Sequence, residues 1–373
     1  MKAQNVIFIA IISIILLSSY INVCVTGPPT LEPGEILSDE DNTPLDVGTY
    51  SSPAVIDWDQ DGADDLIVGE GPGQIYLFKN YGTNTNYSFY SEGEFLTYSN
   101  GTKLEVAGYS TPSVADWNSD GLVDLIVGSQ LGKIYLFQNE GNSSHPLFNT
   151  RTLLIGEFEN YTRWTAPHIV DWNGDSILDL LVGNFQGEFL YFENNGTATQ
   201  PSLSTPAVLK SSEINAPLDV GFHSHPFCVD WDEDGLIDLI SGDDRGSLTW
   251  YKRIANTTTE LKPMHYIRDE RDNVITVSPI TAPCFFDWNK DNQIDLFLGD
   301  QTGQIHMFLT SGVPSSSSLP SSTTGSSSTN PVSSVSTSSA EPPLLTSGFL
   351  LVIPLFSVVG IILWRKATNR RKR

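Results

Sequence analysis

Residues 110–137 have the sequence STPSVADWNSDGLVDLIVGSQLGKIYLF. A short apolar run is followed by a loop rich in Asp and Asn, a second apolar run, a turn bounded by Gly128 and Gly132, and a third apolar run. Short apolar runs separated by turns of this kind are typical of consecutive β-strands. The stretch therefore predicts three antiparallel strands, with a polar loop between the first two.

The same pattern occurs five times along the chain, and the other copies begin at Ser51, Thr165, Ser224 and Thr281. The first loop aspartates follow one another at intervals of 59, 55, 59 and 57 residues; they are Asp57, Asp116, Asp171, Asp230 and Asp287. A repeat of this length suits a four-stranded propeller blade with one expanded loop. We predict an all-β fold, a five-bladed β-propeller over residues 27–309.

The fifth copy stops after its third predicted strand, at Phe308. Residues 31–38, LEPGEILS, precede the first copy, at the place of a fourth strand. We predict that they complete the fifth blade, which closes the ring and removes the open sheet edges.

The two ends of the chain differ from the repeats. Residues 1–26 contain an apolar run behind Lys2 that is too short to span a bilayer, so we expect a secretory signal peptide; an uncleaved anchor is the alternative. Residues 310–343 are mostly Ser and Thr and predict an O-glycosylated stalk. Residues 344–364 carry no charge and predict one transmembrane helix, and the basic residues 365–373 predict a cytoplasmic tail. The expected protein is a type I, single-pass cell-membrane protein with the propeller outside.

The charge of the chain excludes one class of partner. It has 44 Asp and Glu residues against 20 Lys and Arg, a net charge of −24, whereas nucleic-acid binding needs a concentrated basic face. Three cysteines are too few for a disulfide scaffold. Cys228 and Cys284 precede the loops of neighbouring copies, and we consider a disulfide between them.

Each copy carries the pattern D-x-[DN]-x-D-x-x-x-D between its first two predicted strands. Oxygen ligands at alternating positions are typical of a site for a hard cation with six to eight ligands, and Ca²⁺ is the cation that fits. We therefore predict up to five Ca²⁺ ions. The side-chain ligands of loops one to five are expected to be Asp57, Asp59, Asp61 and Asp65; Asp116, Asn118, Asp120 and Asp124; Asp171, Asn173, Asp175 and Asp179; Asp230, Asp232, Asp234 and Asp238; and Asp287, Asn289, Asp291 and Asp295.

Two alternatives compete with this interpretation. An EF-hand needs Glu at position twelve and a helix on both sides, whereas position twelve here lies in a predicted strand, as Val68 does in loop one. A solvated acidic turn needs no ion, but the carboxylates crowded into these small loops would repel one another without a cation.

The five loops are not identical. Loops one and four have Asp rather than Asn at position three, so we expect them to bind calcium more tightly than the others. Position six favours Gly for its sharp turn, but it is Ser176 in loop three and Asn292 in loop five. Because Asn tolerates a left-handed backbone better than Ser, loop three departs most from the pattern.

The copies resemble FG-GAP/VCBS-type repeats, the calcium-loop propeller blades also found in the head of integrin α subunits. The resemblance covers nearly all of residues 27–309, although integrin heads have seven blades rather than five. A Ser/Thr-x-Pro motif stands where the family has Gly-Ala-Pro, with Pro53, Pro112, Pro167, Pro226 and Pro283. The resemblance implies a propeller with calcium, and adhesion or ligand binding only as an expectation, because fold is not function.

We expect the calcium loops to face the membrane, because the chain leaves for the stalk after a third strand. Six N-glycosylation sequons are present, and the four that follow third strands are expected on that same side. They are Asn86, Asn142, Asn195 and Asn256, while Asn100 and Asn160 fall near fourth strands.

The opposite face would carry rings around the mouth of the channel. Seven residues before the first loop aspartates stand Tyr50, Tyr109, Trp164, His223 and Ile280. The first four could bind an extracellular protein or glycan. The alternative, which we favour, is that these rings plug the channel. The tryptophans at position two of the loops repeat too regularly for a ligand site and predict packing between blades. A transition-metal site of His168, His223 and His225 lacks a further ligand.

Three functions follow from these observations. The first is a cell-surface calcium-binding propeller for adhesion or recognition of an extracellular partner. The second is a glycan-binding lectin. The third is a polysaccharide lyase or hydrolase, which we disfavour, because no catalytic set stands apart from the calcium loops, so we expect no enzyme.

Overall fold

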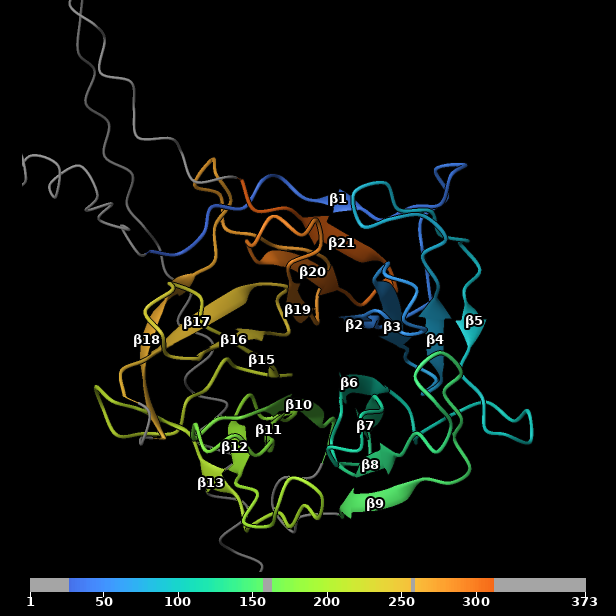
Figure 1. The fold of residues 1–373 in the computed structure, drawn as a ribbon. Coiled ribbons are helices and arrows are strands. Elements are labelled where there is room, and N and C mark those ends of the chain that lie inside the picture. Colours follow the sequence, from blue (N-terminus) through green and yellow to red (C-terminus); the bar gives the residue numbers. More distant parts are fainter. Residues whose placement is uncertain (1–26, 157–162, 256–258, 312–373) are drawn as a thin grey trace, which may run out of the picture. The chain divides into compact units, whose positions relative to one another are not determined.

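The computed structural model describes residues 27–156, 163–255 and 259–311. In these ranges all regular secondary structure is β-strand, in five sheets arranged radially (Figure 1). The innermost strands of the five sheets surround an axial cavity of about 300 Å³. The predicted all-β, five-bladed propeller is confirmed.

Four of the five blades have four strands each. Blade one contains β2 (Ser52–Ile56), β3 (Asp65–Gly69), β4 (Ile75–Phe78) and β5 (Glu94–Phe95). Blade two contains β6 (Thr111–Ala115), β7 (Asp124–Gly128), β8 (Ile134–Phe137) and β9 (Thr152–Ile155). Blade three contains β10 (Ala166–Val170), β11 (Asp179–Gly183), β12 (Phe189–Phe192) and β13 (Ala207–Val208). Blade five contains β19 (Ala282–Phe286), β20 (Asp295–Gly299), β21 (Ile305–Phe308) and β1 (Glu35–Ile36).

Blade four has one strand more than its repeat predicts. It contains β15 (His225–Val229), β16 (Asp238–Gly242), β17 (Leu248–Arg253), β18 (Glu260–Tyr266) and β14 (Lys210–Ser211). The extra strand, β14, pairs in parallel with β18. A strand of two residues is too short to produce an alternating pattern, so the sequence offers no sign of it.

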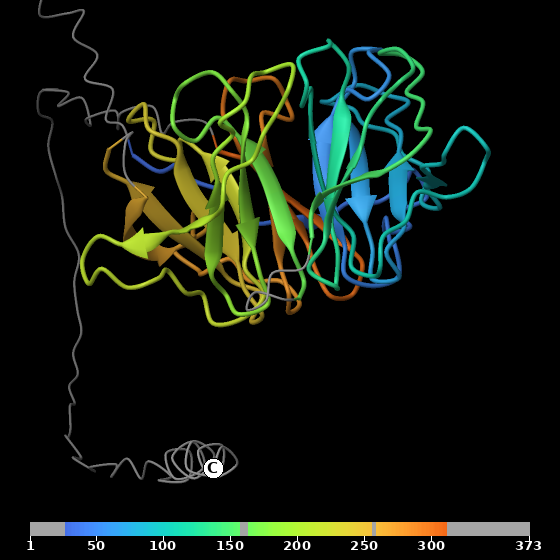
Figure 2. The ribbon, with the colours of Figure 1, turned by 90° about the horizontal axis from the view of Figure 1, so that it is seen from below.

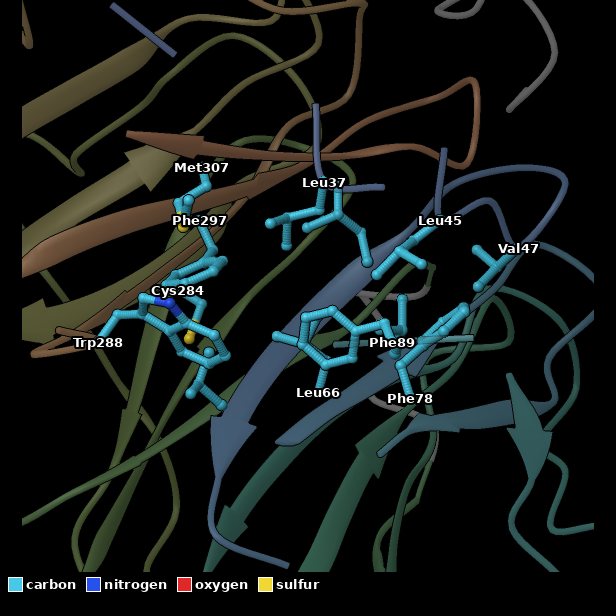
Figure 3. Packing of buried hydrophobic residues seen from close by; sticks show 13 residues of the cluster. Leu37, Leu45, Val47, Leu66, Phe78, Phe89, Cys284, Trp288, Phe297 and Met307 are labelled. Carbon is cyan, nitrogen blue, oxygen red and sulfur yellow. The ribbon is translucent and has the colours of Figure 1, made fainter. Parts of the chain in front are cut away.

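The ring closes as predicted from residues 31–38. The β1 strand pairs antiparallel with β21, so that Glu35 lies opposite Met307. Leu37 and Leu45, from the same N-terminal segment, belong to a buried cluster that also contains Phe78 of blade one and Phe297 of blade five (Figure 3). The first and last parts of the repeat region are therefore joined both by a sheet and by a hydrophobic core.

Four similar clusters fill the other wedges between neighbouring blades, and each of the five contains one loop tryptophan. In the first wedge, the ring of Trp58 stacks on Phe148 of blade two, with ring centroids 6.1 Å apart. All five tryptophans are buried, which confirms their predicted packing role; they are Trp58, Trp117, Trp172, Trp231 and Trp288.

The glycine that ends each second strand allows two blades to approach closely. A Cβ atom on Gly69 would lie 1.9 Å from the carbonyl oxygen of Ser110, which opens the next blade. The corresponding glycines meet the neighbouring backbone in the same way; they are Gly128, Gly183, Gly242 and Gly299. Any side chain here would push the blades apart.

Several predictions concern segments beyond the described residues. These are the signal peptide, the transmembrane helix at 344–364, the tail at 365–373 and all of the stalk except its first two residues. Thr310 and Ser311 still belong to the propeller, because Thr310 is buried and Ser311 donates its backbone N–H to Thr30. Across the described ranges we find no helix with the length and apolar character that crossing a membrane requires.

Candidate functional site

The five acidic loops occupy equivalent places in the blades. In blade one, β2 ends directly before Asp57 and β3 begins at Asp65, and Ile56 pairs with Asp65 across the ladder. The same register occurs in the other four blades. The five loops therefore lie at the same end of their strands, and Figure 2 shows the sheets from the side with loops at both ends.

The first aspartate of each loop holds the loop backbone in place. In loop one, Asp57 Oδ1 accepts the N–H of Asp61 at 3.1 Å and Asp57 Oδ2 accepts the N–H of Gly62 at 3.0 Å. The side chain at position five continues the pattern: Asp61 Oδ1 accepts the backbone N–H of Ala63 at 3.0 Å. The other four loops repeat these bonds. The loops are thus shaped by their own hydrogen bonds.

Two residues of every loop adopt a left-handed backbone, at positions four and six. In loop one, φ is 58° at Gln60 and 95° at Gly62. Position six keeps this conformation in loops three and five, where Ser176 has a φ of 68° and Asn292 a φ of 67°. The departures from Gly therefore leave the loop shape unchanged, although a left-handed conformation costs a residue with a side chain about 1–2 kcal/mol.

The ninth aspartate of each loop has a structural task that the sequence did not reveal. All five are fully buried and accept the backbone N–H of the residue fifteen positions later at 2.7–2.8 Å. In loop one, Asp65 Oδ2 also accepts the N–H of Trp58 at 3.0 Å. Burial raises the pKa of Asp65 to about 7 and the pKa of Asp124 to about 6, although hydrogen bonds oppose the shift. A cation beside such a group would favour its ionised form.

The donor set fits calcium. Carboxylate oxygens of Asp57, Asp59 and Asp61 lie within 4.8 Å of one another, and so do those of Asp230, Asp232 and Asp234. Among the described residues, three buried carboxylate oxygens of the loops have no hydrogen-bond partner; they are Oδ1 of Asp59, Oδ1 of Asp232 and Oδ2 of Asp124. Unpartnered buried carboxylate oxygens are suitable ligands for a hard cation.

Two lysines reach into the loops that have four carboxylates, which sequence reasoning missed. Lys79, the residue after β4, contacts Asp59 and lies 3.3 Å from Asp61. Lys252, in β17, contacts Asp232 and lies 2.8 Å from Asp234. Both lysines stand 22 residues after the first aspartate of their loop, and this shared spacing could have revealed them in the sequence.

A short hairpin follows the third strand in each of the first three blades, and an asparagine at its start holds it together. In blade one, Asn80 donates its Nδ2–H to the carbonyl of Asp64, and its Oδ1 accepts the N–H groups of Gly82 and Ser88. Asn139 and Asn194 accept the corresponding N–H groups in blades two and three. The hairpins carry the sequons Asn86, Asn142 and Asn195, which are exposed, as is Asn100. The sequons Asn160 and Asn256 lie outside the described residues.

The predicted rings do meet at the other end of the channel. Ring centroids are 4.5 Å apart for Tyr50 and Tyr109, 3.6 Å for Tyr109 and Trp164, and 4.4 Å for Trp164 and His223. All four, and Ile280 at the fifth position, have a left-handed backbone with φ between 48° and 63°. Behind them lies a space of about 20 Å³, roughly that of one water molecule. This packing favours the plug over an open ligand site.

The turns near these rings carry acidic and amide side chains that are buried. Glu70, Asn184, Asp243 and Asp300 are all buried. Asp300, for example, accepts the N–H and the hydroxyl of Thr302 with its Oδ1. These side chains shape the turns of their own blades instead of facing a partner.

The three histidines considered for a transition metal do not form a cluster. His223 packs against Trp164 at the mouth of the channel, whereas the ring of His168 lies 4.2 Å from that of Phe227. Burial lowers the pKa of His168 to about 4 and the pKa of His225 to about 3. In the described part of the chain, only aspartates gather closely enough to hold an ion.

The disulfide considered between Cys228 and Cys284 is not formed. Both residues are buried free thiols, and they belong to different hydrophobic clusters. They lie on neighbouring innermost strands. Cys228 packs in the cluster between blades three and four, whereas Cys284 packs in the cluster between blades five and one. Burial accordingly raises the pKa of the Cys284 thiol to about 12.

Comparison with known proteins identifies one repeat. Residues 116–182, which contain loops two and three, match the model of the FG-GAP-like repeat family. No curated protein matches the chain.

Solved structures with a similar fold are distant in sequence. A lectin of Agrocybe aegerita that recognises non-reducing terminal N-acetylglucosamine has 15% identity and a TM-score of 0.39, over 73% of this chain and 71% of that one. A GH43_1 enzyme from Xanthomonas citri has 10% identity and a TM-score of 0.46, over 72% and 89%. AofleA from Arthrobotrys oligospora has 12% identity and a TM-score of 0.38, over 73% and 72%.

Proposed function

Because the chain carries an FG-GAP-like repeat within a five-bladed propeller, we propose that it is a calcium-binding recognition module of the cell surface. The apolar segment 344–364 would hold it in the membrane, with the propeller outside.

The observation that supports calcium is the convergence of three carboxylates in loop one and in loop four, within a loop shape that hydrogen bonds set in all five blades. Asp59 and Asp232 each keep a buried oxygen without a partner among the described residues. The side chains at positions one, three, five and nine, with the carbonyl of position seven, would hold one ion per loop. An ion that binds only the folded chain would stabilise it by mass action.

Ion uptake can be measured on the purified full chain. We expect native mass spectrometry to count up to five Ca²⁺ ions, and the melting temperature to be higher in calcium than in EGTA. Asp120→Asn, in loop two, is expected to remove one ion, whereas Asp219→Asn, outside the loops, is a control that keeps all of them. An absence of ion uptake would contradict the proposal.

Recognition is proposed for a groove at blade four, beside β17, β18 and the turn between β16 and β17 that contains Arg245. The groove has a volume of about 1170 Å³, and its lining includes Asp219, Arg245, Tyr266, Arg268 and Asp269. Tyr266 is 41% exposed, and the side chain of Arg245 is 59% exposed. Aromatic and charged groups of both signs in a concave site suit a peptide or a glycan.

A glycan array probed with the full chain, with and without EGTA, separates the candidate functions. Glycan binding that is lost in Tyr266→Ala would identify the lectin alternative. Release of cleaved sugars would identify an enzyme instead. If no glycan binds, the recognition module for a protein partner remains the better interpretation.

A further inference from the structure

The residue 22 positions after the first loop aspartate varies together with position three of the same loop. It is Lys79 in loop one and Lys252 in loop four, the two loops that have Asp at position three. In the loops that have Asn at position three, it is Gln138, Glu193 or Leu309. Both loops that have the additional carboxylate therefore also have the lysine, and the other three loops have neither.

The two lysines occupy the same place in their loops. Each ammonium group lies between the carboxylates of positions three and five, and contacts both. These are two of the side chains that a calcium ion would share. The lysine side chains are 30% and 25% exposed, so water screens their ion pairs only in part.

The lysine cancels the additional charge of its loop. Four carboxylates and one ammonium give loops one and four a net charge of −3 at these positions, the same as three carboxylates give loops two and five. Loop three differs in the opposite direction, because Glu193 lies near its position-three side chain, with Asn173 Nδ2 3.4 Å from Glu193 Oε1. Counted over these same positions, the net charge of loop three is −4, the most negative of the five; Asp64, Glu233 and Lys290 lie at other loop positions and are outside this count.

We propose that Lys79 and Lys252 are internal counter-ions that hold loops one and four together without calcium and compete with calcium for them. The inference rests on the proposed calcium binding and reverses the affinity order expected from the carboxylate count. Loops two, three and five bind calcium more tightly, and loop three most tightly. Loops one and four fill last, because the ammonium group must move away before the ion enters.

A calcium titration followed by native mass spectrometry tests the order. We expect the wild-type chain to take up three ions first and two more at higher calcium concentration. In Lys79→Met or Lys252→Met, one late ion should move to the early group, with an affinity gain of about tenfold, because a unit charge a few ångströms from the site is removed. Lys262→Met is the matched control, since Lys262 is exposed on the neighbouring strand β18, opposite Lys252; it should change nothing.

The reciprocal variant places the lysine where it is absent. Gln138→Lys, in blade two, should move one early ion to the late group. The melting temperature gives an independent measurement: Lys79→Met should melt earlier than wild type in EGTA and at nearly the same temperature in saturating calcium.

The outcomes distinguish the two proposals. If neither the wild-type chain nor any variant takes up calcium, the proposed calcium-binding function is contradicted. If five ions bind but the lysine variants leave their order and the EGTA melting temperature unchanged, only the counter-ion role is overturned.

Discussion

The hydroxyl of Ser51 accepts the backbone N–H of Asp300 at 2.8 Å, although the two residues are 249 positions apart. The same hydroxyl donates to the carbonyl of Gln304 at 2.6 Å. Ser51 thus joins the start of blade one to the turn between β20 and β21 of blade five. Ser110, Thr165 and Ser224 connect the next blades in the same way.

Ser51→Ala is expected to lower the free energy of unfolding by roughly 1–3 kcal/mol, because it leaves two backbone groups without a partner. Thr281 is the matched comparison, because its buried hydroxyl has no hydrogen-bond partner among the described residues. Thr281→Val should therefore be neutral or stabilising. Urea unfolding of both variants measures the difference, and equal losses in the two would contradict the role of Ser51 as a link.

Ser176→Gly should raise the free energy of unfolding by about 0.5–1 kcal/mol, because glycine adopts a φ of 68° without strain but loses more entropy on folding. The reverse change in loop two, Gly121→Ser, should destabilise the protein. A Cβ atom on Gly121 meets nothing within 4 Å, so only its backbone conformation is tested. A melting temperature that shifts in the same direction in both variants would contradict this explanation of position six.

His168 should make stability depend on pH. Burial lowers its pKa in the folded state to about 4, from the 6.5 that is usual for a histidine side chain in water. Between these values the unfolded chain binds a proton that the folded chain excludes, so the free energy of unfolding falls as the pH decreases from about 6.5 to about 4, by at most about 1.4 kcal/mol per pH unit.

His168→Phe removes this proton and keeps a ring beside Phe227. The difference in unfolding free energy between variant and wild type should therefore change between pH 6.5 and pH 4 and stay constant above about pH 7. Subtraction of the wild type cancels the contribution of the loop carboxylates. His265→Gln, at an exposed position, should follow the wild-type curve, and a His168→Phe curve parallel to wild type would refute the prediction.

Trp164→Ala distinguishes the plug from a ligand site. If the rings plug the channel, the variant loses the contacts of Trp164 with Tyr109 and His223. Its free energy of unfolding should then be lower than that of the wild type by roughly 2–3 kcal/mol. Phe222→Ala is the control, because Phe222 is 50% exposed and its removal should cost little. A Trp164→Ala variant with wild-type stability and lost partner binding would support the ligand site instead.

Much of the fold could be predicted because each repeat contains the sequence pattern of its own strands and loop. Positions one to seven of the loops are shaped by hydrogen bonds between residues at most five positions apart, as between Asp57 and Gly62, so the pattern D-x-[DN]-x-D was sufficient to place them. The strands were predictable for the same reason, since apolar runs and glycine turns alternate five times. Even the closure through residues 31–38 followed from counting strands.

The sequence by itself therefore determined the blades, their number and the acidic loops, because these depend on interactions within a few residues. Only the tertiary structure decided that Asp65 is buried as an acceptor of backbone N–H groups, that Lys79 lies among the loop carboxylates, that the rings of Tyr109 and Trp164 pack on each other, and that Cys228 and Cys284 stay apart. Each of these contacts depends on side-chain directions between strands or blades, which the closed ring sets and which spacing along the chain does not contain.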